Sequence, residues 1–199
     1  MLHKDLIRHG MEFVRAISQH QYEVTPRGIH FPKQRAIVQG QFDTWVNGAD
    51  HQVDPNVVPL EALNYLLKAG LQVSGGISAW FIAPFRNNTA PTSALTAATF
   101  AGTQNEFVAY TETTRQAWAL PTDPTAGVFS NSAAPAVFTA DSTVGTGAGI
   151  DVYGAGVLGS SAKSATSSKL LTAALFGGAR NLKTPDKLTI QYSLSATSV

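Results

Sequence analysis

The second half of the chain consists of short β-type runs separated by turn residues, and this pattern limits the fold more than any other feature. In the last run, Leu188, Ile190, Tyr192 and Leu194 alternate with polar residues, which is the two-residue period of a strand buried on one face. The other runs cover residues 78–85, 106–111, 115–120, 135–140, 149–158 and 169–176. Short strands at this spacing predict a mainly β protein, an antiparallel jelly-roll-like sandwich.

Helical periodicity is clearest between residues 58 and 71. Leucines recur there at helical spacing, Pro59 and Glu61 suit a first turn, and Gly70 suits an end. A second amphipathic pattern, weakened by Gly10, covers residues 4–17. We therefore expect one or two short helices beside the strands.

The composition divides the chain into two parts. All five histidines lie within the first 51 residues, whereas the chain beyond Leu95 is rich in Ala, Thr, Ser and Gly and poor in charge. Residues 22–54 show little periodicity apart from one possible strand near 35–42, and prolines interrupt them. The sequence predicts an extended N-terminal arm over 1–54 and a β-sandwich domain over 55–199. A chain that lacks residues 1–54 is accordingly expected to remain folded.

Charge and cysteine content exclude several classes of function. Fourteen Lys and Arg balance thirteen Asp and Glu, so no strong field attracts nucleic acid or an anionic membrane. The absence of cysteine excludes thiol nucleophiles, Cys-based zinc sites and disulfides. The N-terminal residues lack the apolar core of a signal peptide, and no run reaches the roughly 18 apolar residues of a membrane span. We expect neither a nucleic-acid nor a membrane partner.

The stretch "GAGVLG", Gly154–Gly159, matches the dinucleotide-binding pattern G-x-G-x-x-G. A nucleotide site also needs a βαβ unit and an acidic residue about 20 positions later. Asp151 and Asp186 have no acidic residue between them, and the preceding strand pattern continues through the glycines. We therefore interpret these glycines as part of a strand and expect no cofactor.

The sequence offers only weak evidence for other catalytic or metal-binding sites. Ser160 and Lys163 form an S-x-x-K pattern without the companion motifs of serine–lysine acyl enzymes. Glu112 and Arg115 suggest a surface ion pair. The carboxylates Asp141, Asp151 and Asp186 are scattered, which disfavours a depolymerase, and no metal-binding motif is present. We expect that the chain is not an enzyme and holds no metal.

One internal similarity lies outside these motifs. "TAATFAGTQN" (96–105) and "TAALFGGARN" (172–181) agree at most positions. Either this is chance in a chain rich in Ala, Thr and Gly, or it marks two similar loop-to-strand corners of a pseudo-symmetric sandwich.

The order of several motifs resembles a class of tailed-bacteriophage structural proteins, namely capsid decoration (cement) proteins and minor structural proteins. The motifs are "NVVPLEALNYLLKAGL", "ISAWFIAPF", "EFVAYTETTRQAW", "VYGAGVLGSSAK", "LLTAALF" and "DKLTIQYSL". The resemblance covers about Asn56 to Leu194. It departs from the common pattern at Ala62, where glycine is expected, and residues 1–54 have no counterpart.

This resemblance implies a virion protein on the outer capsid surface, assembled in the host cytoplasm, that clamps neighbouring major capsid subunits and stabilises the expanded head. Its expected partners are the major capsid protein and further copies of itself, as a dimer or trimer. The alternative is a tail or fibre component that binds a host receptor. Basic and aromatic residues alternate along the arm, and we expect a solvated or protein-binding arm rather than a nucleic-acid contact. The predicted capsid-interface residues are Leu6, Arg8, Phe13, Arg15, Tyr22, Arg27, Phe31, Arg35 and Trp45.

Overall fold

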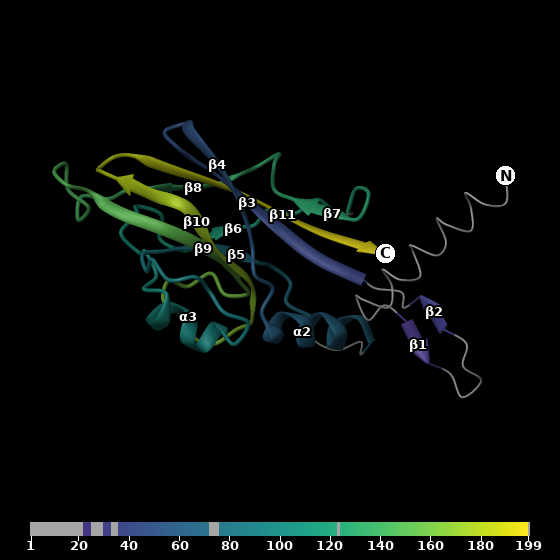
Figure 1. Ribbon diagram of the computed structural model, residues 1–199. Coiled ribbons are helices and arrows are strands. Elements are labelled where there is room, and N and C mark those ends of the chain that lie inside the picture. Colours follow the sequence, from purple (N-terminus) through teal and green to yellow (C-terminus); the bar gives the residue numbers. More distant parts are fainter. Residues whose placement is uncertain (1–21, 25–29, 33–35, 72–75, 123, 199) are drawn as a thin grey trace, which may run out of the picture. The chain divides into compact units, whose positions relative to one another are not determined.

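The computed structural model describes residues 22–24, 30–32, 36–71, 76–122 and 124–198 (Figure 1). The chain divides into two compact units, Val38–Ala196 and a smaller one formed by Met1–Ile37 with Thr197–Val199. The smaller unit contains an antiparallel pair of strands, β1 (Tyr22–Val24) and β2 (His30–Pro32). The larger unit contains the other described elements, apart from the first two residues of β3 and the last two of β11, and is described below.

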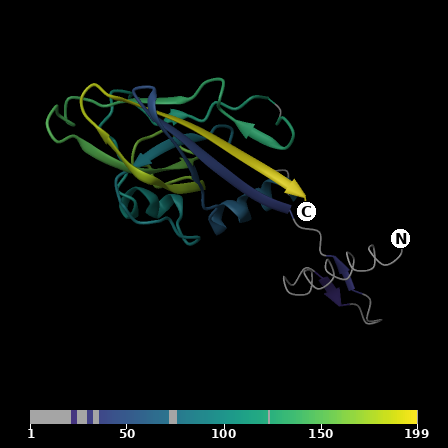
Figure 2. The same ribbon diagram turned by 45° about the horizontal axis from the view of Figure 1, so that its top comes forward.

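Two antiparallel sheets make the larger unit mainly β, as predicted. One sheet has the order β4-β3-β11-β7, and β8 also pairs with β11. The other has the order β10-β9-β5-β6. β3 and β11 run side by side as the long strands of Figure 2. The strand bounds are β3 Ala36–Val46, β4 Ala49–Pro55, β5 Phe81–Phe85, β6 Gln116–Ala117, β7 Val128–Ser130, β8 Ala136–Thr139, β9 Ile150–Leu158, β10 Leu170–Leu182 and β11 Lys187–Ser198.

The two sheets share one hydrophobic core. Phe42 of β3 lies against Tyr192 of β11, with 4.5 Å between ring centroids, and edge-on to Phe176 of β10, at 6.4 Å. Leu188 and Ile190 are wholly buried with Tyr192, which confirms the alternation predicted for the C-terminal strand. Burial of each such side chain stabilises the fold by about 1.5–3 kcal/mol.

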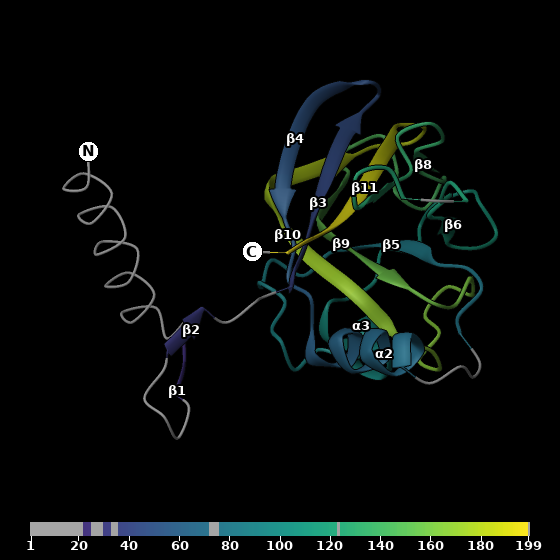
Figure 3. The same cartoon turned by 90° about the vertical axis from the view of Figure 1, so that its right-hand side faces the viewer.

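Helix α3 (Ala97–Thr103) packs on the other face of the four-stranded sheet, and helix α2 (Leu60–Leu71) lies beside α3 (Figure 3). The buried Ala62 of α2 belongs to the core that the two sheets share. The helix predicted over 58–71 is therefore confirmed. Phe100 of α3 packs edge-on against Phe85 of β5, with centroids 6.0 Å apart. The Glu61 carboxylate joins the two helices to the sheet, because it accepts hydrogen bonds from the amides of Ala97 (2.9 Å) and Leu170 (3.0 Å).

The predicted division of the chain after Asp54 is wrong. The strand expected near 35–42 is β3, but it continues to Val46 and pairs with β4. Phe42 and Thr44 are wholly buried, so these two strands are part of the sandwich core. A chain without residues 1–54 would lose both strands and their buried residues, so it should not remain folded.

Two local predictions also differ from the structure. Residues 106–111 form only isolated bridges, Phe85 with Glu106 and Tyr110 with Ala140, instead of a strand. The two similar ten-residue segments adopt different structures, since 97–103 is helical whereas 170–182 is a strand. The similarity therefore does not mark two equivalent corners.

The glycines of "GAGVLG" lie in and just after β9, as the strand interpretation predicted. A Cβ atom at Gly154 would lie 2.1 Å from the ring of Phe85, and one at Gly156 would lie 2.6 Å from the ring of Phe100. Glycine is thus required here because aromatic rings pack directly on the strand backbone.

Candidate interaction face

The structure places only three of the nine predicted interface residues. Tyr22 lies on β1, Phe31 on β2 and Trp45 on β3. Tyr22 pairs with Pro32, and Phe31 pairs with Glu23. Trp45 belongs to the larger unit, whereas Tyr22 and Phe31 belong to the smaller one. The other six predicted residues lie outside the described part of the chain: Leu6, Arg8, Phe13, Arg15, Arg27 and Arg35.

Trp45 is part of a cluster on the outer side of the β3–β4 hairpin. Its ring stacks on His51 at 4.6 Å between centroids, with only 7° between the planes. His51 Nε2 lies 2.9 Å from Asp43 Oδ1, and Gln41 Nε2 donates to Asp43 Oδ2 at 3.1 Å. The hydrogen bonds hold these side chains as a connected row on the strand surface.

The two-residue period of β3 places this cluster outside. Phe42 and Thr44 face the core, so Gln41, Asp43 and Trp45 point the other way. On β4, Val53 is the register partner of Asp43. We name the outward set Gln41, Asp43, Trp45, His51 and Val53 the hairpin face.

The hairpin face combines exposed apolar and polar surface. Val53 is 50% exposed, and the His51 side chain is 47% exposed. An open depression of about 580 Å³ adjoins the face. Its lining is uncharged: Gln39, Gly40, Gln41, Val53, Pro55, Asn56, Val128, Ser193 and Ser195.

Asn56 fixes the floor of this depression. Its side-chain oxygen accepts a hydrogen bond from the amide of Gly40 at 2.6 Å. Its side-chain nitrogen donates to Tyr192 Oη at 3.2 Å and to Thr172 Oγ1. Because one carboxamide joins β3, β10 and β11, the depression has a firm base.

Arg180 of β10 anchors the hairpin from the inner side. The guanidinium is wholly buried and donates to Thr44 Oγ1 at 3.1 Å and 2.9 Å. It also forms an ion pair with Asp50 at 2.5 Å. Asp50 itself is mostly exposed. β4 is the edge strand of its sheet, and this anchor keeps the hairpin in a fixed position over β10.

Asp54 lies on the inner side of the same hairpin. Its Oδ1 accepts a hydrogen bond from the amide of Gly177 at 2.6 Å, while Oδ2 is buried without a partner among the described residues. Burial raises the pKa of this carboxyl, and the Gly177 hydrogen bond and the positive charge of Arg180 oppose the rise. The folded state therefore disfavours the ionised form of Asp54.

The predicted surface pair of Glu112 with Arg115 is wrong. Arg115 is 1% exposed and forms a two-pronged pair with Glu106, at 2.8 and 2.7 Å. Glu112 instead accepts hydrogen bonds from the amide of Thr139. The Glu106–Arg115 pair also binds the loop 160–165, through the amide of Ser164 and the carbonyl oxygens of Ser160 and Ala165.

The S-x-x-K pattern lies in a turn. The Lys163 ammonium donates to the carbonyl oxygens of Val108 (3.1 Å) and Tyr110 (2.8 Å) and lies 3.6 Å above the centre of the Tyr110 ring. Partial burial lowers the pKa of Lys163. The arrangement uses the lysine to fasten the loop to the 108–110 segment.

The three scattered carboxylates bind separate partners. Asp141 accepts from the Thr143 amide, Asp151 from Asn181, and Asp186 from Asn47. The Asn47 hydrogen bond lowers the pKa of Asp186. Among the described residues, no group of three or more His, Asp or Glu side chains lies close enough together to hold a metal ion. None of the helices described is long and apolar enough to cross a membrane.

Most of the hairpin face was missed by the sequence analysis, although a signal exists. In "QFDTW" the buried Phe42 and Thr44 alternate with the outward Gln41, Asp43 and Trp45. The sequence predicts an arm here, because a threonine such as Thr44 does not stand out as a core residue.

Comparison with known protein families, curated proteins and solved structures gives no match.

Proposed function

We propose that this chain is a structural protein of a phage virion, which acts as a capsid cement protein on the outer surface of the head. The observation that supports this function best is the hairpin face, a rigid outer surface that carries exposed Val53 and the stacked Trp45–His51 pair. Tryptophan surrounded by polar groups is frequent among residues that dominate protein–protein binding.

Three charged side chains that are buried or partly buried stiffen the larger unit, which supports an adhesive role. Arg115, Arg180 and Glu61 each join two or more segments of the larger unit. They make a stiff platform, and a stiff partner loses little conformational entropy on binding. The jelly-roll-like connectivity, the arm and the homo-oligomer are further parts of this proposal, supported by the resemblance and by the mainly β architecture.

Co-sedimentation of the purified chain with expanded capsids that lack it tests the proposal. Saturable binding at many copies per head is the expected result, and host cells serve as the parallel bait. Binding to cells but not to heads would instead support a receptor-binding tail or fibre component. The stack of the half-buried Trp45 on the exposed His51, beside an uncharged polar depression, favours that second function.

A matched pair of variants tests whether the hairpin face makes the contact with the capsid. Val53→Asp places a charge on the hairpin face, while Leu120→Asp makes the same change at another exposed apolar residue, one outside the hairpin. We expect Val53→Asp to weaken capsid binding and Leu120→Asp to bind normally. Equal binding by both variants would remove the hairpin face from the interface.

The arm needs a different truncation from the one the sequence suggested. Removal of residues 1–35 leaves β3 and β4 intact, whereas removal of 1–54 does not. If the arm acts as a clasp, the shorter deletion remains folded and no longer holds capsids. Normal binding by this truncation would contradict the clasp.

A further inference from the structure

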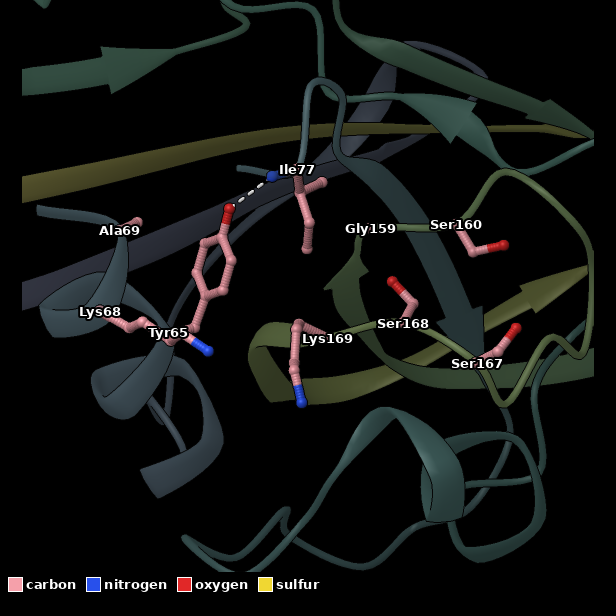
Figure 4. Close-up of a pocket in the computed structure, with 9 residues that line it drawn as sticks. All are labelled: Tyr65, Lys68, Ala69, Ile77, Gly159, Ser160, Ser167, Ser168 and Lys169. Carbon is pink, nitrogen blue, oxygen red and sulfur yellow. Dashed lines mark hydrogen bonds between the residues drawn. The ribbon is translucent and has the colours of Figure 1, made fainter. Parts of the chain in front are cut away.

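A second depression lies away from the hairpin face, beside α2. It has a volume of about 490 Å³ (Figure 4), within the range of about 300–1,000 Å³ that is typical of small-ligand sites. Helix α2 forms one wall, and the segments that follow β9 and precede β10 form the opposite wall. The lining residues are Tyr65, Lys68, Ala69, Ile77, Gly159, Ser160, Ser167, Ser168 and Lys169.

The charge of this lining is wholly positive. Lys68 comes from α2 and Lys169 from the opposite wall, and none of the lining residues that the structure describes is acidic. Figure 4 shows both lysine side chains at the space between the walls. The carboxylate of Glu61 lies 3.3 Å from the ammonium of Lys169. Since Glu61 also accepts two backbone amides, it positions Lys169 while leaving its other donors available.

Hydroxyl groups supply the rest of the polar lining. Ser160, Ser167 and Ser168 come from the wall opposite α2 (Figure 4). The Ser168 hydroxyl is buried and has no hydrogen-bond partner among the described residues. An unpaired buried hydroxyl is costly, so a ligand atom that completes its hydrogen bond gains affinity.

The walls are held in place before any ligand arrives. Tyr65 Oη accepts a hydrogen bond from the amide of Ile77 at 2.6 Å (Figure 4). The amide of Gly159 donates to the carbonyl oxygen of Lys169 at 3.0 Å. A Cβ atom at Gly159 would lie 2.6 Å from Ile77 and 2.7 Å from Ser168 Oγ, so only glycine fits this part of the floor.

We propose that this depression binds a small phosphorylated sugar or polyol. Two ammonium groups on facing walls suit a phosphate, because charge-assisted hydrogen bonds to phosphate oxygens are the strong ones. Three serine hydroxyls suit the hydroxyl groups of a polyol, and the volume leaves room beyond a single phosphate. This site is separate from the hairpin face and does not depend on a virion role.

Titration calorimetry on the full chain tests the proposal, with glucose 6-phosphate, glycerol 3-phosphate, inorganic phosphate and glucose as probes. We expect both phosphate esters to bind more tightly than inorganic phosphate, and glucose not to bind. Affinity should fall as salt is added, because screening weakens contacts to exposed ammonium groups. Equal binding of glucose and glucose 6-phosphate would overturn the proposal, and so would no binding of either ester at about 10 mM.

Variants assign the binding to this depression. Lys68→Gln with Lys169→Gln should weaken ester binding by about tenfold or more, while Lys187→Gln, an exposed lysine outside the lining, should leave it unchanged. Ser168→Ala should weaken binding without loss of thermal stability, since it removes an unpaired buried hydroxyl. If the lysine double variant keeps its circular dichroism spectrum and still binds normally, the site lies elsewhere and the assignment is wrong.

Discussion

The guanidinium of Arg115 and the carboxylate of Glu106 form two hydrogen bonds, and both side chains are almost completely excluded from solvent. Removal of one partner leaves an uncompensated buried charge, which typically costs about 3–5 kcal/mol. We expect Arg115→Met and Glu106→Gln each to lower the free energy of unfolding by this amount. Urea denaturation measures it.

The double variant provides the control for this pair. Arg115→Met combined with Glu106→Gln removes both charges, so its loss should be clearly smaller than the sum of the two single losses. Strictly additive losses would show that the ion pair contributes little beyond the separate bonds to the 160–165 loop.

Two glycine-to-alanine substitutions should have opposite effects. Gly154→Ala drives a Cβ atom into the Phe85 ring and the carbonyl oxygen of Ala174, and overpacking of this kind costs about 1–3 kcal/mol or more. Gly102 lies in α3 with no atom within 4 Å of an added Cβ, so Gly102→Ala should be neutral or stabilise by up to about 1 kcal/mol. Thermal unfolding of the two variants side by side checks this contrast. A stable Gly154→Ala variant would contradict the strand packing described for β9.

The stability contributed by Asp54 should depend on pH in the direction opposite to that of an ordinary salt-bridged carboxylate. Burial raises its folded-state pKa above 3.8, so between the unfolded and the folded pKa the native state binds more protons. The free energy of unfolding therefore falls as the pH rises through that window. Asp54→Asn keeps an acceptor for Gly177 and removes the titration. We expect the variant to gain stability relative to the native chain at pH 7.

The pH profile of this variant completes the test. The difference in unfolding free energy between Asp54→Asn and the native chain should shrink as the pH falls from 7 toward 3.8 and below, because the Asp54 carboxyl becomes protonated first in the folded state and then in the unfolded state. A difference that is constant from pH 7 to pH 3.5 would show that Asp54 titrates alike in the folded and unfolded chains.

The anchor of the hairpin should depend on the buried cation more than on its exposed partner. Arg180→Met removes the donors to Thr44 of β3 and to Asp50 of β4, and it should speed amide exchange along β4 by a large factor, because both strands of the hairpin lose their attachment to β10. Asp50→Asn changes only the exposed end of the pair and keeps a side-chain oxygen that can accept a hydrogen bond from Arg180, so it should affect the protection of β4 less than Arg180→Met does. Hydrogen-exchange mass spectrometry distinguishes the two. Equal protection of β4 in both variants would refute the anchoring role.

The sequence was sufficient for the elements with strong periodicity. The alternation of Leu188, Ile190 and Tyr192 is the inward face of β11, and the leucine spacing over 58–71 is α2. The strand interpretation of Gly154 is also confirmed, because this glycine lies in β9. In each case the periodicity extends over a whole element, so local and tertiary preferences agree.

The buried charged pair, the core position of Thr44 and the depression beside α2 depended on tertiary contacts that no local sequence pattern shows. Arg115 was assigned to the surface because charged residues are rarely buried, and its partner Glu106 lies nine residues away rather than three. Thr44 is a core residue only because Arg180 reaches it from a strand far along the chain. The lysines of the α2 depression are separated by 101 residues, from Lys68 to Lys169, and no short motif could have joined them.

β11 occupies an interior position in its sheet, between β3 on one side and β7 and β8 on the other. A ribosome makes it after all three of these neighbours. During synthesis, β3 and β4 therefore lack their inner partner strand until residues 187–196 have left the exit tunnel. Until then, Tyr192 cannot cover the ring of Phe42. Since pairings this distant in sequence form slowly, the nascent chain exposes apolar surface for most of its translation. Chaperone binding to ribosome-held chains should thus cease abruptly when this one strand emerges.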